Sequence, residues 1–544
     1  MALTKATHRM IDGASINVKD YGAVGDGVTD DTVAIQAAFD LVHTTTSASY
    51  PSNRNGAADA TNIYFPPGVY VTSAPLNLGK ADNFMYWTTL EMHGATIEST
   101  YVGSDAALIL WTPYNCVFNG MGVFCDGATA IKVNNSRNSK YQDVYVGSSS
   151  TTSTSKTLHL RGVQFNNSWN NISFNQNVGM AKPQWSLYVD CTTPILPYAW
   201  AAAPVNSFTD LHIANSMNAM YFENASRITL LNLEHEGFDA ALAPGVSQFI
   251  NCGQIIMAET HGESFPSGAN QFYFEDCSHV QLRNIKMGSN YHHIKFKNCR
   301  NLNVDGLYGG GTVFYEGVNT DVSIKNVRVY RGGTREVFKE DSVGYLKRFY
   351  ARNIFIRDAS DLNDIGQMPL ITSGTYSSAD NWITNERALD AAGSITTYHF
   401  TSVNDAAYTD VSPLGYIESV FTIDSAASYP YLLQTFDNTK LSGKETKAMF
   451  VACFKVDNLP AGFTSGSQSI GLQNSSPIQD AFYGSFWVRV GDWALSYTYC
   501  EFDTADTETR MVWSYNNSFA VGTKFLFGGS TIYAGSEIKL PFID

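Results

Sequence analysis

The chain has 544 residues, of which 44% are hydrophobic and only 16% charged, and its formal net charge is −15. This length exceeds one ordinary globular core, so either several domains or a one-dimensional stack of repeats is expected. The negative charge argues against nucleic acid as a partner, since phosphate neutralisation needs clustered Lys and Arg, and no run of 18 apolar residues suggests membrane insertion.

The N-terminal region predicts a short strand followed by a helix. The first residues lack the apolar core of a signal peptide, and residues 16–21 then alternate as a strand. Thr29 can cap a helix whose first turn carries two aspartates, which suit the helix dipole. One apolar face of that helix would be formed by Val33, Ala37 and Leu41.

A strand, a rigid turn and a second strand are predicted next. Residues 62–70 read Asn-Ile-Tyr-Phe-Pro-Pro-Gly-Val-Tyr. The Pro-Pro-Gly centre is typical of a tight turn, and the flanking aromatic and β-branched residues favour strands.

Four similar phrases in the middle of the chain predict a solenoid. Their last residues are Ala225, Cys252, Cys277 and Cys299, which lie 27, 25 and 22 positions apart. The third and fifth residues after each of them are apolar in all four copies. A period in the twenties with strand-like alternation indicates stacked coils, and the Leu-x-x-Leu-x-Leu frame of leucine-rich repeats is missing. We therefore predict a parallel β-helix.

Three of these repeat positions are cysteines, and we expect them to pack as small buried side chains. Stacked coils would bring them about 5 Å apart per turn. A disulfide or metal role is the less favoured alternative. The chain has no Cys-x-x-Cys pair, so zinc is not expected, and we predict neither a metal nor another cofactor.

The segments 18–32 and 63–70 together resemble the opening of the pectate-lyase-like superfamily, and the repeats extend this resemblance to about residue 360. More narrowly, the motifs look like those of bacteriophage tailspikes that depolymerise bacterial capsular polysaccharides. The resemblance implies an all-β fold in which a helix caps the open end of a right-handed parallel β-helix. It also implies a homotrimer that endo-cleaves the polysaccharide, made in the host cytoplasm, carried on the virion tail and active at the bacterial cell surface.

Four regions are expected along the chain. Residues 1–15 would be a short virion-attachment peptide that binds the phage tail or an adaptor protein, and 16–360 the β-helix catalytic domain. Residues 361–397 are of mixed composition and would form a linker. From 398 to 544, aromatic strands with Gly, Ser and Asn turns predict an antiparallel β-sandwich for trimerisation or carbohydrate binding.

The repeat register predicts which side chains face outward. Strand alternation places the ninth and eleventh residues after each repeat position on the outer wall. Glu234 and Glu236 of one coil would then lie beside His261 and Glu263 of the next coil. Glycosidases need two carboxylates, about 5–5.5 Å apart for retention and about 6.5–9.5 Å apart for inversion. We predict that these four residues are catalytic, with the stereochemical outcome open.

A basic stretch follows these residues and supplies candidate substrate contacts. Lys286 and Tyr308 occupy the ninth position of the next two coils, and Arg283 and Tyr291 lie close in sequence. The tyrosines could stack on sugar rings. The cations suit a polysaccharide lyase, the alternative to a hydrolase, because β-elimination beside a uronate needs a base and a group that neutralises the acid.

Several further alternatives remain. A non-catalytic adhesin would bind glycan through the C-terminal sandwich domain without cleaving it, and outward acids on a solenoid are most often plain solvated surface. A site shared between two chains of a trimer is also open. The other carboxylates that compete for a catalytic role are Asp126, Asp143, Asp190, Asp210 and Glu223.

Overall fold

The structure is a computed structural model. It describes residues 15–45, 60–150, 154–174, 182–192, 195, 197, 205–238, 244–263, 269–287, 293–309, 313–331, 338–358, 364–368, 370–373, 395–398, 400–403, 419–423, 431–437, 447–455, 482–490, 492–501, 508–514, 524–534 and 537–540. The chain divides into two compact units, Met1–Tyr291 and His292–Asp544. Among the described residues, no helix combines the length and the apolar character needed to cross a membrane.

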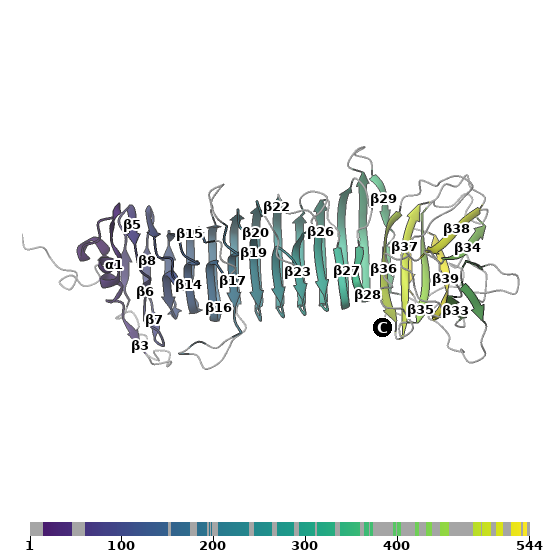
Figure 1. The fold of residues 1–544 in the computed structure, drawn as a ribbon, viewed down its shortest axis with the longest axis horizontal. Coiled ribbons are helices and arrows are strands. Elements are labelled where there is room, and N and C mark those ends of the chain that lie inside the picture. The colour runs from purple at the N-terminus through teal and green to yellow at the C-terminus, as the bar shows by residue number, and fades with distance from the viewer. Residues whose placement is uncertain are drawn as a thin grey trace, which may run out of the picture. The chain divides into compact units, whose positions relative to one another are not determined.

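In its described residues the first unit consists of strands, one 3₁₀ helix and one α-helix (Figure 1). Its elements are β1 (Ile16–Asn17), η2 (Val18–Tyr21), β2 (Asp26–Asp30), α1 (Thr32–Phe39), β3 (Thr44–Thr45), β4 (Asn62–Tyr64), β5 (Gly68–Thr72), β6 (Leu76–Leu78), β7 (Phe84–Tyr86), β8 (Thr89–Glu91), β9 (Ala95–Ser99), β10 (Ala106–Trp111), β11 (Pro113–Tyr114), β12 (Val117–Asn119), β13 (Gly122–Cys125), β14 (Thr129–Arg137), β15 (Lys140–Ser148), β16 (Lys156–Phe174), β17 (Trp185–Asp190), β18 (Val205–Ala214), β19 (Asn218–Glu223), β20 (Ser226–Glu236), β21 (Ser247–Ile250), β22 (Gly253–Glu263), β23 (Asn270–Glu275) and β24 (Ser278–Lys286).

Strands of successive coils pair in parallel in this unit. β18 pairs with β20, β20 with β22, and β22 with β24, each time in parallel register. A second series runs from β17 through β19 and β21 to β23. Parallel pairing between equivalent segments of consecutive coils is the defining feature of a parallel β-helix, so the predicted all-β solenoid is confirmed and is consistent with the right-handed form.

Three faces make up each coil, and we name them from the coil that contains β19 and β20. Face A is residues 218–223, face B is 228–231, and face C is 233–236. Bends with positive φ separate them, at Asn224 and Arg227 between faces A and B and at Asn232 between faces B and C, with φ of 53°, 53° and 54°. Asn tolerates this left-handed conformation better than most residues, which explains why it recurs at these points.

The repeated phrases encode these bends. The third residue of each phrase has positive φ, at Asn224, Asn251, Asp276 and Asn298. The fourth residue is buried in each case. The chain thus turns at the polar third residue where face A ends, and the small side chain of the fourth residue points into the interior.

Apolar side chains fill the interior in columns. The predicted inward positions are buried, including Ile228, Leu230, Ile255 and Met257. Phe222, Phe249 and Phe274 stack from coil to coil, with ring centroids 5.1 and 4.9 Å apart. This spacing is close to the ideal interstrand distance of about 4.8 Å, so the aromatic column keeps the coils in register.

The repeat cysteines are buried and unoxidised, as expected. Cys252, Cys277 and Cys299 are all free thiols. The thiol of Cys252 donates to the carbonyl of Ile250 at 3.3 Å, and that of Cys277 to the carbonyl of Glu275 at 3.3 Å. Each thiol therefore satisfies a carbonyl at the bend while it fills the core.

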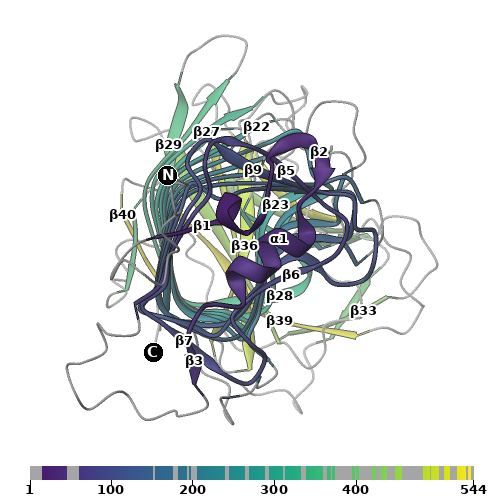
Figure 2. The same cartoon turned by 90° about the vertical axis from the view of Figure 1, so that its left-hand side faces the viewer.

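The N-terminal helix exists, but its start and its buried face differ from the prediction. Figure 2 shows α1 lying across the end of the first coils, as a capping helix should. Thr29 does not cap it, because Asp26–Asp30 forms β2 and the N-cap is Asp31. The Asp31 carboxylate accepts from the backbone N–H groups of Val24 and Gly25 at 2.6 and 3.0 Å, so it holds the preceding loop.

The prediction of which helix face is buried was also wrong. Ile35, Ala38 and Phe39 are buried, whereas Val33 is 82% exposed. The largest side chain of the helix, Phe39, packs edge-on against Phe65, with ring centroids 6.0 Å apart. The free energy gained by burying the larger Phe39 side chain exceeds the cost of leaving Val33 exposed.

The second unit begins with parallel strands and continues with antiparallel ones (Figure 1). Its strands are β25 (His293–Lys297), β26 (Arg300–Gly309), β27 (Val313–Arg331), β28 (Phe338–Asp358), β29 (Asp364–Met368), β30 (Leu370–Ser373), β31 (Ile395–Tyr398), β32 (Phe400–Val403), β33 (Ser419–Ile423), β34 (Tyr431–Asp437), β35 (Lys447–Lys455), β36 (Phe482–Val490), β37 (Trp493–Glu501), β38 (Glu508–Ser514), β39 (Lys524–Ala534) and β40 (Glu537–Leu540).

Pairing changes direction near residue 358. β27 pairs with β28 in parallel as far as Arg331 and Asp358, whereas β28 pairs with β29 in antiparallel register. β35 pairs with both β37 and β39 in antiparallel register, and β34 with β38 likewise. The antiparallel C-terminal region is therefore present; the sandwich and the domain limits at 360 and 397 stay predictions.

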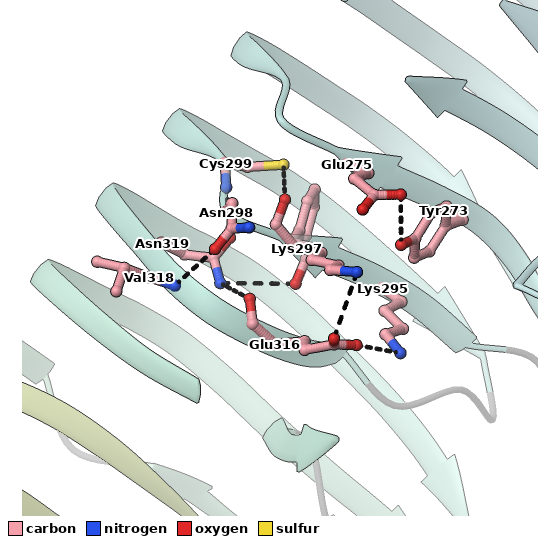
Figure 3. A network of polar contacts seen from close by, with 10 residues as sticks. Tyr273, Glu275, Lys295, Lys297, Asn298, Cys299, Glu316, Val318 and Asn319 are labelled. Carbon is pink, nitrogen blue, oxygen red and sulfur yellow. Dashed lines mark hydrogen bonds and ion pairs between the residues drawn. The ribbon is translucent and has the colours of Figure 1, made fainter. Parts of the chain in front are cut away.

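A polar network stabilises a bend in this unit (Figure 3). The buried Asn319 amide accepts from the backbone N–H of Cys299 at 2.9 Å and donates to the carbonyl of Glu316 at 3.1 Å. The Glu316 carboxylate lies 2.8 Å from the ammonium of Lys295 and 3.5 Å from that of Lys297. The buried side-chain amide of Asn319 thus satisfies both a backbone N–H group and a backbone carbonyl group at the bend.

Candidate functional site

Face C carries a continuous row of ionisable side chains. In the parallel register His212 of β18 pairs with Glu234 of β20, Glu234 with His261 of β22, and His261 with Lys286 of β24. Neighbours in this row are therefore one coil apart, about 4.8 Å between Cα atoms. The predicted alignment of Glu234 with His261 and Lys286 is confirmed.

A second row runs beside the first. Glu236 pairs with Glu263 on the next coil, and with Ala214 on the preceding one. Residues two apart on a strand point to the same side, so the two rows form one patch on the outer wall. The two predicted carboxylate positions are thus direct neighbours.

The bends explain why these side chains point outward. Asn232, Glu259 and Asn284 have φ of 54°, 55° and 50° and restart the strand alternation at face C. The next residue in each coil is buried; these residues are Leu233, Thr260 and Ile285. Alternation then turns the ninth and eleventh residues to solvent, and the Asn232 amide fixes the bend by donating to Asp210 Oδ1 at 2.6 Å.

The imidazole of His261 lies between a carboxylate and an ammonium group. Its Nε2 is 2.6 Å from Glu263 Oε1 and 2.9 Å from Lys286 Nζ. A ring nitrogen has one in-plane position, either a hydrogen or a lone pair, so it cannot donate to the carboxylate and accept from the ammonium at once. This nitrogen therefore either carries a hydrogen and donates to Glu263, or carries a lone pair and accepts from Lys286.

The other imidazole of the patch contacts the other carboxylate. His212 Nε2 lies 3.7 Å from Glu236 Oε1. The side chains of Glu236 and Glu263 are 46% and 55% exposed, and those of His212 and His261 are 40% and 38% exposed. A ligand in solvent can reach all four groups.

Chemically, the patch offers three carboxyl groups, two imidazoles and one ammonium on four successive coils. Such a set can donate a proton to a leaving oxygen, activate a water molecule or remove a proton beside a carboxylate. Within the described residues no group of three or more His, Cys, Asp or Glu side chains is arranged to hold a metal ion.

One predicted substrate contact, Arg283, does not join the patch. Arg283 is exposed, but it follows Leu282 on face B, and its Nη2 donates to Gln281 Oε1 at 3.1 Å. Its position in the sequence is close to Lys286, yet the bend at Asn284 separates the two faces. Tyr308 is 37% exposed and lies in the second compact unit, and Tyr291 lies outside the described residues.

His212 was missed by the sequence reasoning. Its coil does not contain the recognised four-residue phrase, so no repeat offset was assigned to it. A signal does exist, because Phe208, Asp210 and Leu211 match Leu230, Asn232 and Leu233 in register and in the bend at the second position.

The competing carboxylates lie elsewhere on the coil. Asp143 and Asp210 have positive φ, at the bends between faces B and C, and both accept hydrogen bonds from asparagine amides. Asp190 and Glu223 are register partners on face A. Asp126 accepts from the Ser149 hydroxyl at 3.2 Å. None of these five joins the patch on face C.

Comparison with known proteins agrees with this architecture. The family model described as rhamnogalacturonase A/epimerase, pectate lyase-like, matches residues 15–242. Mannuronan C5-epimerase AlgE6 of Azotobacter vinelandii is 50% identical over 58 residues, which are 11% of this chain and 5% of that protein. The chain thus matches only a small part of the length of this curated relative.

Two solved structures resemble the chain at low sequence identity. The tailspike gp42 of Acinetobacter phage vb_AbaP_AS12 is 12% identical with a TM-score of 0.39, covering 91% of this chain and 82% of that one. The catalytic unit of the GH87 α-1,3-glucanase from Streptomyces thermodiastaticus strain HF3-3 is 12% identical with a TM-score of 0.39, covering 64% of each chain. Over residues 15–242, less than half of the chain, the family model and the parallel register both show similarity to pectate lyase-like proteins.

Proposed function

We propose that this protein is a bacteriophage tailspike that binds and endo-cleaves a bacterial capsular polysaccharide by glycoside hydrolysis on face C. The observation that carries the proposal is the direct register pairing of two exposed carboxylates, Glu236 and Glu263. The tailspike-like motifs of residues 18–32 and 63–70 support a capsule as the substrate. The pectate lyase-like match and a relative named for mannuronan support a polysaccharide in general.

In this reaction one glutamic acid protonates the glycosidic oxygen while the other, ionised, acts as base or nucleophile. Either glutamate can take either role, since Glu263 Oε1 lies 2.6 Å from His261 Nε2 and Glu236 Oε1 lies 3.7 Å from His212 Nε2.

A lyase reaction is the second candidate, and one contact favours it. His261 Nε2 is 2.9 Å from Lys286 Nζ. If the ammonium neutralises a uronate carboxylate, the imidazole beside it is placed to remove the proton next to that carboxylate. The same patch would then break the glycosidic bond by β-elimination.

The assembly follows from the same proposal. The protein would form a homotrimer, bind the phage tail or an adaptor through residues 1–15, and use residues 398–544 for trimerisation or sugar binding. Its place would be the virion tail, with cleavage at the bacterial surface. None of these steps requires a cofactor.

A spot test decides between cleavage and binding alone. Purified protein is placed on lawns of capsulated bacteria, and translucent halos are expected where capsule is degraded. The soluble products are then analysed: new reducing ends with no ultraviolet absorbance indicate hydrolysis, and absorbance from a new double bond indicates a lyase. Binding to capsule with neither halos nor new ends would make the protein an adhesin and overturn the proposal.

A further inference from the structure

Face B carries two outward rows of side chains that are uncharged over four successive coils. Residues two apart on a strand point to the same side, so each strand adds one residue to each row. Along the described strands the uncharged stretch lies between Lys140 at one end and Arg283 at the other. Its central part, which we call the face B surface, consists of Ser207, Thr209, Thr229, Leu231, Ile256 and Ala258.

Two aliphatic side chains of the face B surface are open to solvent. Leu231 is 37% exposed and Ile256 is 38% exposed. They are diagonal neighbours on adjacent coils, because Leu231 pairs with Ala258 and Ile256 pairs with Thr229. The surrounding Ser, Thr and Ala side chains are small, so another wall can approach closely. Covering the two aliphatic groups would be favourable.

Faces A and C of the same coils carry charge. On face A, Asp190 pairs with Glu223, and on face C, Glu234 pairs with His261. A rotation axis brings each side chain close to its own copies, so a charged row beside the axis would meet like charges. The net charge of −15 per chain makes such an arrangement less favourable still. Face B is the wall of these coils that can pack against itself without repulsion.

The connections on either side of face B are short in the coils of β20 and β22. β19 ends at Glu223 and β20 begins at Ser226, and faces B and C of β20 are joined by one bend residue, Asn232. The longer connection runs from Glu236 at the end of β20 to Ser247 at the start of β21. It joins face C to face A, at the corner that face B does not touch. Face B is therefore a flat wall that a second copy can reach.

The two edges of face B carry opposite charges. The exposed acids Asp210 and Glu259 lie at the bends toward face C, and the exposed Arg227 lies at a bend toward face A. Arg227 donates from Nε to Gln254 Oε1 at 3.1 Å and makes no ion pair within the described residues. Chains packed in parallel around an axis along the coils bring the basic edge of one copy to the acidic edge of the next, whereas antiparallel chains would bring like edges together.

We propose that the face B surface is a contact between copies of this chain, packed in parallel around an axis that runs along the coils. Leu231 and Ile256 lie against the same surface of the other copies, and Arg227 at one edge faces an acid, Asp210 or Glu259, of the next copy. This contact rests on the homotrimer of the proposed function and identifies the wall that forms it.

Light scattering of glutamate variants tests the position of the surface. Leu231→Glu and Ile256→Glu each place like charges beside the axis, so each should change the mass at micromolar concentration from three chains to one chain of 59.7 kDa. Tyr145→Glu is the matched control, because Tyr145 is a 44% exposed aromatic residue on face C. It should remain trimeric. Circular dichroism of each variant reports whether the coils still fold.

Cross-linking gives a second measurement that does not depend on breaking the contact. The seven cysteines among the described residues are buried, so the unsubstituted chain gives the background with a bismaleimide. Ile256→Cys should form covalent dimers on a denaturing gel, at least about tenfold faster than Glu98→Cys on β9, since a shared contact raises the effective concentration of the two thiols.

A charge exchange tests the edges. Arg227→Glu should raise the concentration at which the trimer dissociates by about tenfold, because it places acids on both edges. Adding Glu259→Arg to Arg227→Glu should recover part of this loss. No effect of Arg227→Glu would overturn the parallel arrangement of edges.

Two results would overturn the contact while leaving the homotrimer standing: a folded Leu231→Glu variant that stays trimeric, or equal cross-linking of Glu98→Cys and Ile256→Cys. An unsubstituted chain that is monomeric would overturn both the contact and the homotrimer. Cleavage is measured separately, so a trimer that is disrupted by Leu231→Glu but makes no halos would support the contact and refute depolymerisation.

Discussion

Glu236 and Glu263 are direct register partners on adjacent parallel strands of face C, and both side chains are about half exposed. Twenty-seven residues of chain separate them, yet the coil brings their Cα atoms to about one interstrand spacing. Each carboxylate also has its own imidazole neighbour, His212 for Glu236 and His261 for Glu263. The two acids thereby have different ionisable neighbours.

Replacing either acid should abolish depolymerisation without abolishing binding. We expect Glu236→Gln and Glu263→Gln each to lower the rate of capsule cleavage about 10²–10⁴-fold, because a general acid or base contributes that much. Release of reducing ends gives the rate, and retention on capsule-coated beads gives binding. Glu98→Gln, an exposed acid on β9, is the control. If both variants cleave at the full rate, the reaction centre lies elsewhere.

His261 and Lys286 separate the two reactions. In a hydrolase Lys286→Gln should reduce cleavage only modestly, because the ammonium does not touch the leaving oxygen. In a lyase the same change should reduce it by at least about 10², since the uronate charge is no longer neutralised. The assay compares new reducing ends with absorbance from unsaturated products. A large loss without unsaturated products would argue against both assignments of Lys286.

Asn232 should matter for the geometry of face C. It has φ of 54° and donates to Asp210 at 2.6 Å. Asn232→Ala should cost about 1–2 kcal/mol, because a non-glycine residue pays for the left-handed conformation. Asn232→Gly removes the same hydrogen bond without that strain, so its midpoint of urea unfolding should lie above that of the alanine variant. Equal midpoints would mean that the bend conformation is not the source of the cost.

His93 should titrate above an ordinary histidine. Its Nδ1 contacts Glu91, and its Nε2 lies 3.2 Å from Asp143 Oδ2. The hydrogen bond with Glu91 first, then that with Asp143, raises the pKa of His93. Glu91→Gln should therefore lower this pKa more than Asp143→Asn does, as followed by NMR of ring-labelled histidine; Glu98→Gln should leave it unchanged.

The stability consequence of this contact has a definite sign. Because the folded pKa of His93 is raised, the contact stabilises the folded state fully below the unfolded pKa of about 6.5, and the gain is lost as pH rises through the folded pKa. The His93 side chain is 58% exposed, so the gain should stay below about 1 kcal/mol. His93→Gln should lower the midpoint of unfolding at about pH 5.5 and leave it unchanged at about pH 9. An equal effect at both values would show that charge is not involved.

A homotrimer should be measurable directly. Light scattering of the purified chain at micromolar concentration should give three times the monomer mass of 59.7 kDa. On heating in detergent, dissociation of the trimer should precede loss of the β-sheet signal in circular dichroism. A mass equal to one chain would reject the trimer while leaving the β-helix untouched.

The repeats alone were enough to predict the β-helix, its inward positions and the outward row on face C. Each depends on a local rule: alternation fixes which side chain points inward, and a constant offset fixes which ones are stacked. Glu234, Glu236, His261 and Glu263 obey both rules, so their neighbourhood followed from counting. The interior position of Cys252 and Cys277 followed in the same way.

Tertiary structure decided what local rules leave free. The helix α1 begins after Asp31, whose carboxylate accepts hydrogen bonds from N–H groups of the preceding loop. Thr29 therefore does not cap the helix. Arg283 went to face B because the bend at Asn284 falls between it and Lys286. Lys156 and Tyr188 meet on coils of irregular length, where no phrase marks the register. The sequence alone determined how equivalent residues stack, because the same offsets recur in each repeat. Only the folded structure determined which charged side chains of neighbouring coils lie side by side where the loops are irregular in length.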